Sequence, residues 1–75
     1  MHQEKVIPGH QEIEQRLMKV EQEHALLNAR VDELARKEVM TPEEEIELKR
    51  LRKIKLFKKD MIAYLRRMLK GSRER

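Results

Sequence analysis

The residues with the spacing of a metal site are Glu21 and His24, which stand three positions apart. On a helix that spacing puts both side chains on one face, and di-iron four-helix bundles combine such a Glu-x-x-His pair with glutamates from facing helices. In the register that the apolar pattern gives, Phe57, Lys58 and Met61 lie opposite this pair, and a lysine there repels a cation. We therefore expect no metal site, and we interpret His24 as a partly buried ring packed on Phe57.

Nucleophilic catalysis has few residues to use in this chain. There is no cysteine, the only serine is Ser72, and no glycine-rich phosphate loop is present. A helical hairpin, which is the fold indicated below by periodicity, also lacks the concave pocket that binds most small substrates. We expect neither an enzyme nor a bound cofactor.

A run of basic residues is the remaining feature with chemical meaning, and it comprises Lys49, Arg52, Lys53, Lys55, Lys59, Arg66, Arg67 and Lys70. The run permits two interpretations: a solvated face that pairs with acidic residues across the hairpin, or a surface that binds the phosphates of RNA or DNA. We expect no reading of base sequence, because no recognised nucleic-acid motif is present and the only aromatic residues are Phe57 and Tyr64. Binding to an anionic membrane surface is less favoured, since the apolar face of this segment is needed for packing.

Charge is distributed unequally along the chain. Residues 1–48 carry 6 Lys/Arg and 12 Asp/Glu, a net charge of −6, whereas residues 49–75 carry 12 Lys/Arg and 2 Asp/Glu, a net charge of +10. Two halves of opposite charge attract each other when they lie side by side.

Size and composition set the fold class. Seventy-five residues form one domain at most, and the 43% charged and 39% apolar composition is typical of long helices. No stretch approaches the roughly 20 apolar residues of a membrane span, and the N-terminal sequence lacks the apolar core of a signal peptide. We expect a soluble cytoplasmic protein without membrane insertion.

The first helix is predicted over residues 10–39, after a flexible tail at residues 1–9 that contains Pro8 and Gly9. Its apolar stripe repeats at spacings of four and three, which is the a/d pattern of a coiled coil. The stripe comprises Ile13, Leu17, Val20, His24, Leu27, Val31 and Leu34.

A helix cap is predicted directly after a short turn at residues 39–41. Thr41 precedes Pro42 and is therefore biased toward the extended conformation of an N-cap residue, while proline is favoured at the first helical position. Glu44, three residues after Thr41, completes a capping box. The second helix is predicted over residues 42–70, with Gly71 ending it and residues 71–75 forming a flexible tail.

The two helices are predicted to form an antiparallel hairpin, because so short a link makes neighbours antiparallel. A turn near residues 40–41 pairs positions whose numbers add up to about 81, and each apolar position of the first stripe then meets an apolar partner. On the second helix the predicted interface comprises Leu51, Ile54, Phe57, Met61, Leu65 and Met68. Met18, Leu26, Leu48 and Leu56 stay outside it, so we expect dimerisation into a four-helix arrangement.

The segments Glu23–Leu34 and Thr41–Leu65 resemble the small bacterial YdcH-like proteins. The resemblance covers roughly residues 13–69 and includes a basic motif with Lys53, Lys55, Leu56, Lys59, Asp60 and Ile62. The departures are Lys58, where the family pattern has an apolar residue, and the first dozen residues. The resemblance implies a helical-hairpin, coiled-coil fold and a bacterial origin, and it implies no activity.

The sequence thus predicts a coiled-coil protein that mediates protein interaction or self-assembly, as a homo-oligomer or with an unknown protein partner. The alternative is a nonspecific nucleic-acid-binding accessory factor. The candidate partner or phosphate-binding face comprises Lys53, Lys55, Leu56, Lys59, Arg66, Arg67 and Lys70.

Overall fold

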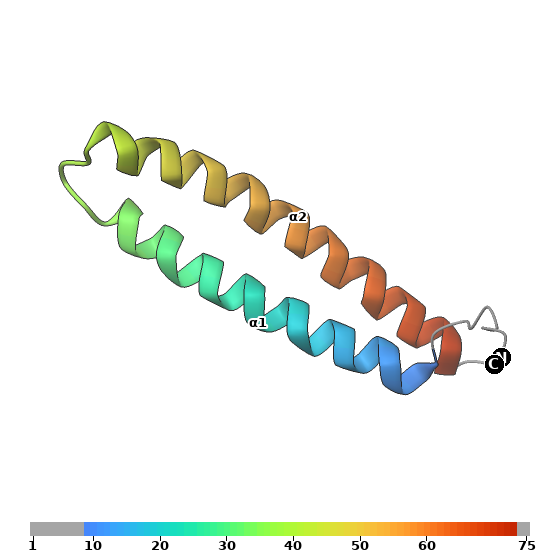
Figure 1. The fold of residues 1–75 in the computed structure, drawn as a ribbon. Helices are drawn as coiled ribbons and strands as arrows, with labels where there is room; N and C mark the ends of the chain where they lie inside the picture. The colour runs from blue at the N-terminus through green and yellow to red at the C-terminus, as the bar shows by residue number, and fades with distance from the viewer. Residues whose placement is uncertain (1–8, 74–75) are drawn as a thin grey trace, which may run out of the picture.

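The computed structural model describes residues 9–73 and shows two helices that lie side by side in opposite directions (Figure 1). Helix α1 spans His10–Ala35 and helix α2 spans Pro42–Arg73. The described part of the chain contains no strand. The predicted all-α antiparallel hairpin is confirmed. The predicted N-terminal tail lies outside the described residues, except for Gly9.

Helix α1 begins where the sequence predicts and without a side-chain cap. Gly9 is extended at the N-cap position, and its carbonyl oxygen accepts a hydrogen bond of 3.0 Å from the Ile13 amide. No side chain caps the first turn, which agrees with the absence of a good capping residue before His10.

Helix α1 ends at Ala35, four residues before the predicted end. The next position of its apolar stripe would be Glu38, and a longer helix would bury that carboxylate against α2. The chain instead leaves the helix after a tight bond of 3.1 Å from the Lys37 amide to the Leu34 carbonyl. Met40 can then fold back onto the core. The turn is longer than predicted and spans residues 36–41.

The cap of α2 is formed as the sequence predicts. The Thr41 amide donates to Glu44 Oε1 at 2.9 Å, and the Glu44 amide donates to Thr41 Oγ1 at 3.1 Å. These two bonds are the reciprocal pair of a capping box. Lys37 Nζ bonds the other oxygen of Glu44 at 2.6 Å and ties the turn to the cap.

Helix α2 continues to Arg73, so the prediction that it ends at residue 70 is wrong for residues 71–73. Gly71 does not adopt the left-handed conformation that ends many helices. That ending is usually closed by an apolar residue after the glycine, and every residue after Gly71 here is polar. Glu74 and Arg75 lie outside the described residues.

The core of the hairpin consists of two clusters at opposite ends. The loop-end cluster contains Val31, Leu34 and Leu48, with Met40 and Leu51 packed against it. The open-end cluster contains Ile13, Val20 and Leu65, and the residues packed against it are Leu17, Met61, Ile62, Met68 and Leu69. The predicted register is consistent with these groups, because Val31 lies with Leu51 and Ile13 lies with Met68.

The seam is the line of side chains along which the helices meet, and on α2 it differs from the prediction. The residues of α2 that repeat every three and four positions and are all buried or half-buried are Leu48, Leu51, Lys55, Lys58, Ile62, Leu65 and Leu69. Leu48 is only 6% exposed, whereas Ile54 is 36% and Phe57 is 63% exposed. The prediction was therefore wrong for Ile54 and Phe57, and it omitted Leu48, Lys55, Lys58, Ile62 and Leu69.

The physical reason is that α2 carries two adjacent heptad stripes. The stripe through Phe57 is apolar from Ile54 to Met68, and the prediction took four of its six residues on α2 from this stripe. The stripe through Leu48 packs against fully buried Leu34. The two middle positions of the seam, Lys55 and Lys58, can hold lysine because its aliphatic stem packs while its ammonium group reaches solvent.

Candidate interaction surfaces

The middle of the seam is polar, and we call it the waist. It contains His24 from α1 and Lys55 and Lys58 from α2, all half-buried. Lys58 Nζ bonds Glu23 Oε1 at 2.9 Å, which satisfies that ammonium group. The Nε2 atom of His24 is buried and has no hydrogen-bond partner.

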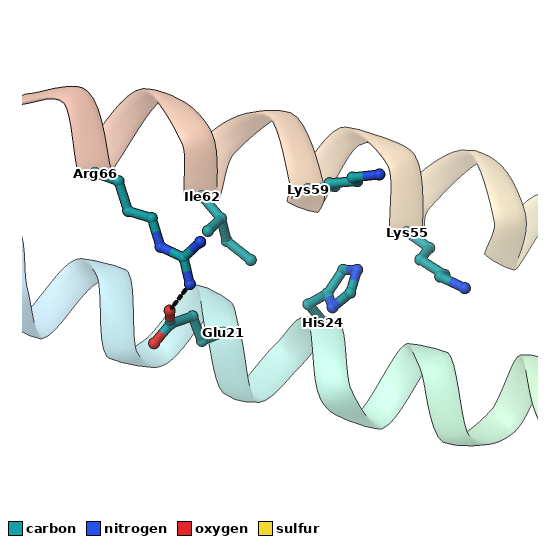
Figure 2. Close-up of a pocket in the computed structure, with 6 residues that line it drawn as sticks. All are labelled: Glu21, His24, Lys55, Lys59, Ile62 and Arg66. Carbon is teal, nitrogen blue, oxygen red and sulfur yellow. Dashed lines mark hydrogen bonds and ion pairs between the residues drawn. The ribbon is translucent and has the colours of Figure 1, made fainter.

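The sequence interpretation of His24 holds in part. The ring is half-buried, as predicted. Phe57, its predicted packing partner, is largely exposed, and the ring instead lies between α2 side chains that include Lys55 and Lys59 (Figure 2). The rotation of α2 that brings Lys55 into the seam carries Phe57 away from it.

Two interhelix ion pairs define one side of the hairpin, which we call the apolar side. Glu23 pairs with Lys58, and Arg30 forms a two-bond pair with Glu47 at 2.9 Å for each bond. Between these pairs lies a groove of about 320 Å³ whose remaining walls are Leu26, Leu27 and Ile54. The groove is almost purely apolar between the two charged pairs.

Exposed apolar residues continue the apolar side along α2. The second stripe comprises Ile54, Phe57, Met61, Tyr64 and Met68, at spacings of three and four. Met61 and Met68 are half-buried against the open-end cluster, and the other three are exposed. Phe57 and Tyr64 are 63% and 61% exposed, and Leu26 on α1 is 73% exposed. Large side chains at this spacing and exposure form the pattern that one helix presents to another.

The ion pairs of the apolar side shift the acidities of their members. The hydrogen bond from Lys58 lowers the pKa of Glu23, and the hydrogen bonds from Arg30 lower the pKa of Glu47. Both carboxylates stay ionised at neutral pH, so an ion pair persists at each end of the groove.

The opposite side of the hairpin, which we call the basic side, contains a groove of about 440 Å³ (Figure 2). Its lining residues are Glu21, His24, Lys55, Lys59, Ile62 and Arg66. Arg66 Nη2 bonds Glu21 Oε2 at 2.8 Å at one end of the groove. Lys55 and Lys59 form no ion pair with any of residues 9–71.

The structure brings together part of the predicted phosphate-binding face. Lys55, Lys59 and Arg66 share the basic groove, and Leu56 lies beside the two lysines in a smaller adjoining groove. The remaining three members are exposed and do not line the basic groove; they are Lys53, Arg67 and Lys70.

The other interpretation of the basic run, in which its residues pair with acidic residues across the hairpin, holds for one residue. Of the eight predicted residues, Arg66 alone pairs with α1 among the described side chains. Lys58 also pairs across the hairpin, although the sequence argument did not include it in the run. The heptad spacing from Leu48 to Leu69 is the sequence signal from which the seam position of Lys58 could have been predicted.

Residues 9–73 contain no cluster of three or more side chains of the types that ligate metals, and neither helix is long and apolar enough to cross a membrane. Comparison of the chain with family models, with curated proteins and with solved structures finds no match.

Proposed function

We propose that this protein is a helical interaction module that binds another helical chain through its apolar side. The supporting observations are the second stripe, in which Phe57 and Tyr64 remain more than half exposed, and the apolar groove lined by Leu26, Leu27 and Ile54. Burying such side chains against a partner helix contributes about 25 cal/mol per Å² of apolar surface. The role is protein binding without catalysis, and the resemblance to YdcH-like proteins and the cytoplasmic location remain predictions.

A second copy of the chain is the partner that we propose, in a four-helix arrangement. The sequence of α1 carries six acidic and three basic residues, and that of α2 carries five acidic and eleven basic residues. A two-fold axis parallel to the helices places each α2 against the oppositely charged α1 of the other copy. Leu26 of one copy then packs against Ile54 and Phe57 of the other, and both turns lie at the same end.

The proposal is tested by comparing two neighbouring substitutions of the same kind. Phe57→Glu places a charge on the apolar side, whereas Leu56→Glu places it at a residue of nearly equal exposure, 60%, on the other flank. Sedimentation equilibrium should show a dimer for the wild type and for Leu56→Glu, and a monomer for Phe57→Glu. A monomeric wild type at high micromolar concentration would rule out self-association.

The arrangement itself is tested by one label in the turn. The chain has no cysteine, and Val39 is 84% exposed, so Val39→Cys gives a single site for a spin label. Turns at the same end place the two labels within about 25 Å, whereas an antiparallel arrangement, with the turns at opposite ends, places them roughly 50 Å apart. A long distance in a dimeric sample would reject the arrangement and leave self-association standing.

The alternative function is nonspecific binding of nucleic acid, and it is supported by the unpaired cations of the basic side. Each phosphate contact releases a counterion, so affinity for RNA should fall steeply between 50 and 200 mM salt. A titration of a single-stranded RNA at several salt concentrations measures this slope. A flat salt dependence would exclude this function.

A further inference from the structure

We propose that the basic groove at the waist is a discrete seat for one phosphate group, held by Lys55, Lys59 and His24. The seat is independent of self-association, because the basic side faces away from the apolar side. It sharpens the alternative function, since it concentrates binding at one place instead of spreading it along α2.

The first observation is the contrast between the two lysines of the waist. Lys58 and Lys55 both occupy seam positions of α2 and are both half-buried. Lys58 has a carboxylate partner, Glu23, at 2.9 Å, whereas Lys55 has no ion pair among the described side chains. Removing part of the water from a cation is unfavourable unless an opposite charge compensates it. The groove beside Lys55 is the place from which that charge can come.

The second observation is the unsatisfied nitrogen of His24. Buried polar atoms in folded proteins are nearly always hydrogen-bonded, and an exception points to a missing water or ion. Figure 2 shows the ring reaching from α1 to a position below Lys59 and beside Lys55. His24 lines the groove, and its Nε2 atom is buried.

The chemistry of the lining selects an anion with several acceptor atoms. Two free ammonium groups supply donors only, and the imidazole supplies a donor from whichever nitrogen carries the hydrogen. The one carboxylate of the groove, Glu21, is already bonded to Arg66 at 2.8 Å and stands at the end of the groove. A phosphate group matches two lysines because it carries up to two negative charges and three free oxygens.

The experiment follows the ring signals of His24 by nuclear magnetic resonance while inorganic pyrophosphate is added at low salt. The wild-type signals should shift and saturate with one site per chain. Lys55→Gln should weaken binding about tenfold, the effect of losing one charge-assisted hydrogen bond. Lys53→Gln removes the same charge from an exposed position outside the groove and should change the affinity less than twofold.

Each result either supports or overturns the seat. Equal loss in the two variants means diffuse attraction to the basic surface, and the absence of a saturable shift means that water alone satisfies Nε2; both overturn the proposal. Lys59→Gln, at an exposed position, repeats the test if Lys55→Gln alters the helicity. A titration with single-stranded RNA distinguishes a single phosphate site from diffuse binding of nucleic acid. If Lys55→Gln and Lys53→Gln weaken RNA binding equally and pyrophosphate does not bind, the alternative function is supported and the seat is rejected.

Discussion

The middle of the hairpin and its two ends use the same heptad spacing but different chemistry. At the loop end Leu34 is fully buried with Val31 and Leu48, and at the open end Ile13 and Leu65 are buried. At the waist the corresponding positions hold a histidine and two lysines. The comparison shows that the ends supply the apolar burial that stabilises the fold, while the waist exposes polar groups to both grooves.

The difference also explains how two surfaces of opposite character fit on so small a molecule. The ion pair between Glu23 and Lys58 closes the waist toward the apolar side, where it brackets the groove beside Leu27. Lys55 has no such partner and faces the basic side. A polar seam position therefore costs stability, whereas an apolar one provides it.

The largest effect is expected from a truncation at the loop end. Leu34→Ala removes a fully buried side chain and should destabilise the hairpin by about 2–5 kcal/mol, enough to unfold a domain of marginal stability. Leu56→Ala, at a 60% exposed position, should cost less than about 0.5 kcal/mol. Urea unfolding followed by circular dichroism measures both. Equal costs would contradict the placement of the core.

The next effect has the opposite sign and lies at the waist. His24→Leu replaces a ring with an unsatisfied buried nitrogen by a side chain that joins the two apolar clusters. We expect the free energy of unfolding to rise by about 1–3 kcal/mol, the cost of leaving such a group without a partner. Thermal unfolding of the variant at pH 7 checks this. A lower melting temperature would show that the ring contributes packing that outweighs its unsatisfied atom.

A smaller effect is expected at the cap that starts α2. Thr41→Ala removes the hydroxyl that accepts the Glu44 amide and should destabilise the fold by about 1 kcal/mol. Thr41→Ser keeps the hydroxyl and serves as the control. The difference in urea midpoint between the two variants is the measurement, and equal midpoints would mean that the hydroxyl contributes nothing to the fold.

The smallest effect is expected on the stability of the fold at acid pH. Glu23, Glu44 and Glu47 accept hydrogen bonds from Lys58, Lys37 and Arg30, and these bonds lower their pKa values below the ordinary 4.5. The unfolded chain then binds protons more readily than the folded one, so these pairs stabilise the fold above about pH 4.5. Their contribution is lost as the pH falls below that value.

The test compares the melting temperatures of the wild type and of Glu47→Gln from pH 7 to pH 3. The wild type should be the more stable above pH 5, and the two curves should converge as the pH falls toward 3. Glu23→Gln, at the waist, should behave in the same way. Curves that stay parallel over the whole range would show that neither carboxylate is more acidic in the folded chain.

Local signals in the sequence predicted the boundaries that depend on neighbouring residues. Thr41, Pro42 and Glu44 interact within one turn of helix, so their types and spacing were sufficient to predict the cap. The end of α1 was wrong because it depends on the partner helix: Glu38 is an acceptable helical residue in isolation and is excluded only by the packing surface of α2. The predicted end of α2 was wrong because no apolar residue follows Gly71 to pack back against the helix. Without that contact the helix continues through the glycine.

The sequence by itself determined two helices, their antiparallel order and their register, because periodicity and a short capped turn restrict the chain to that arrangement. Only the tertiary structure decided which face of α2 meets α1. Two heptad stripes lie side by side on α2, and the predicted interface took four residues from the more apolar one, through Phe57, and only Leu51 and Leu65 from its neighbour. Packing under Leu34 selected the other stripe, which placed two lysines at the waist and left Phe57 and Tyr64 on the surface.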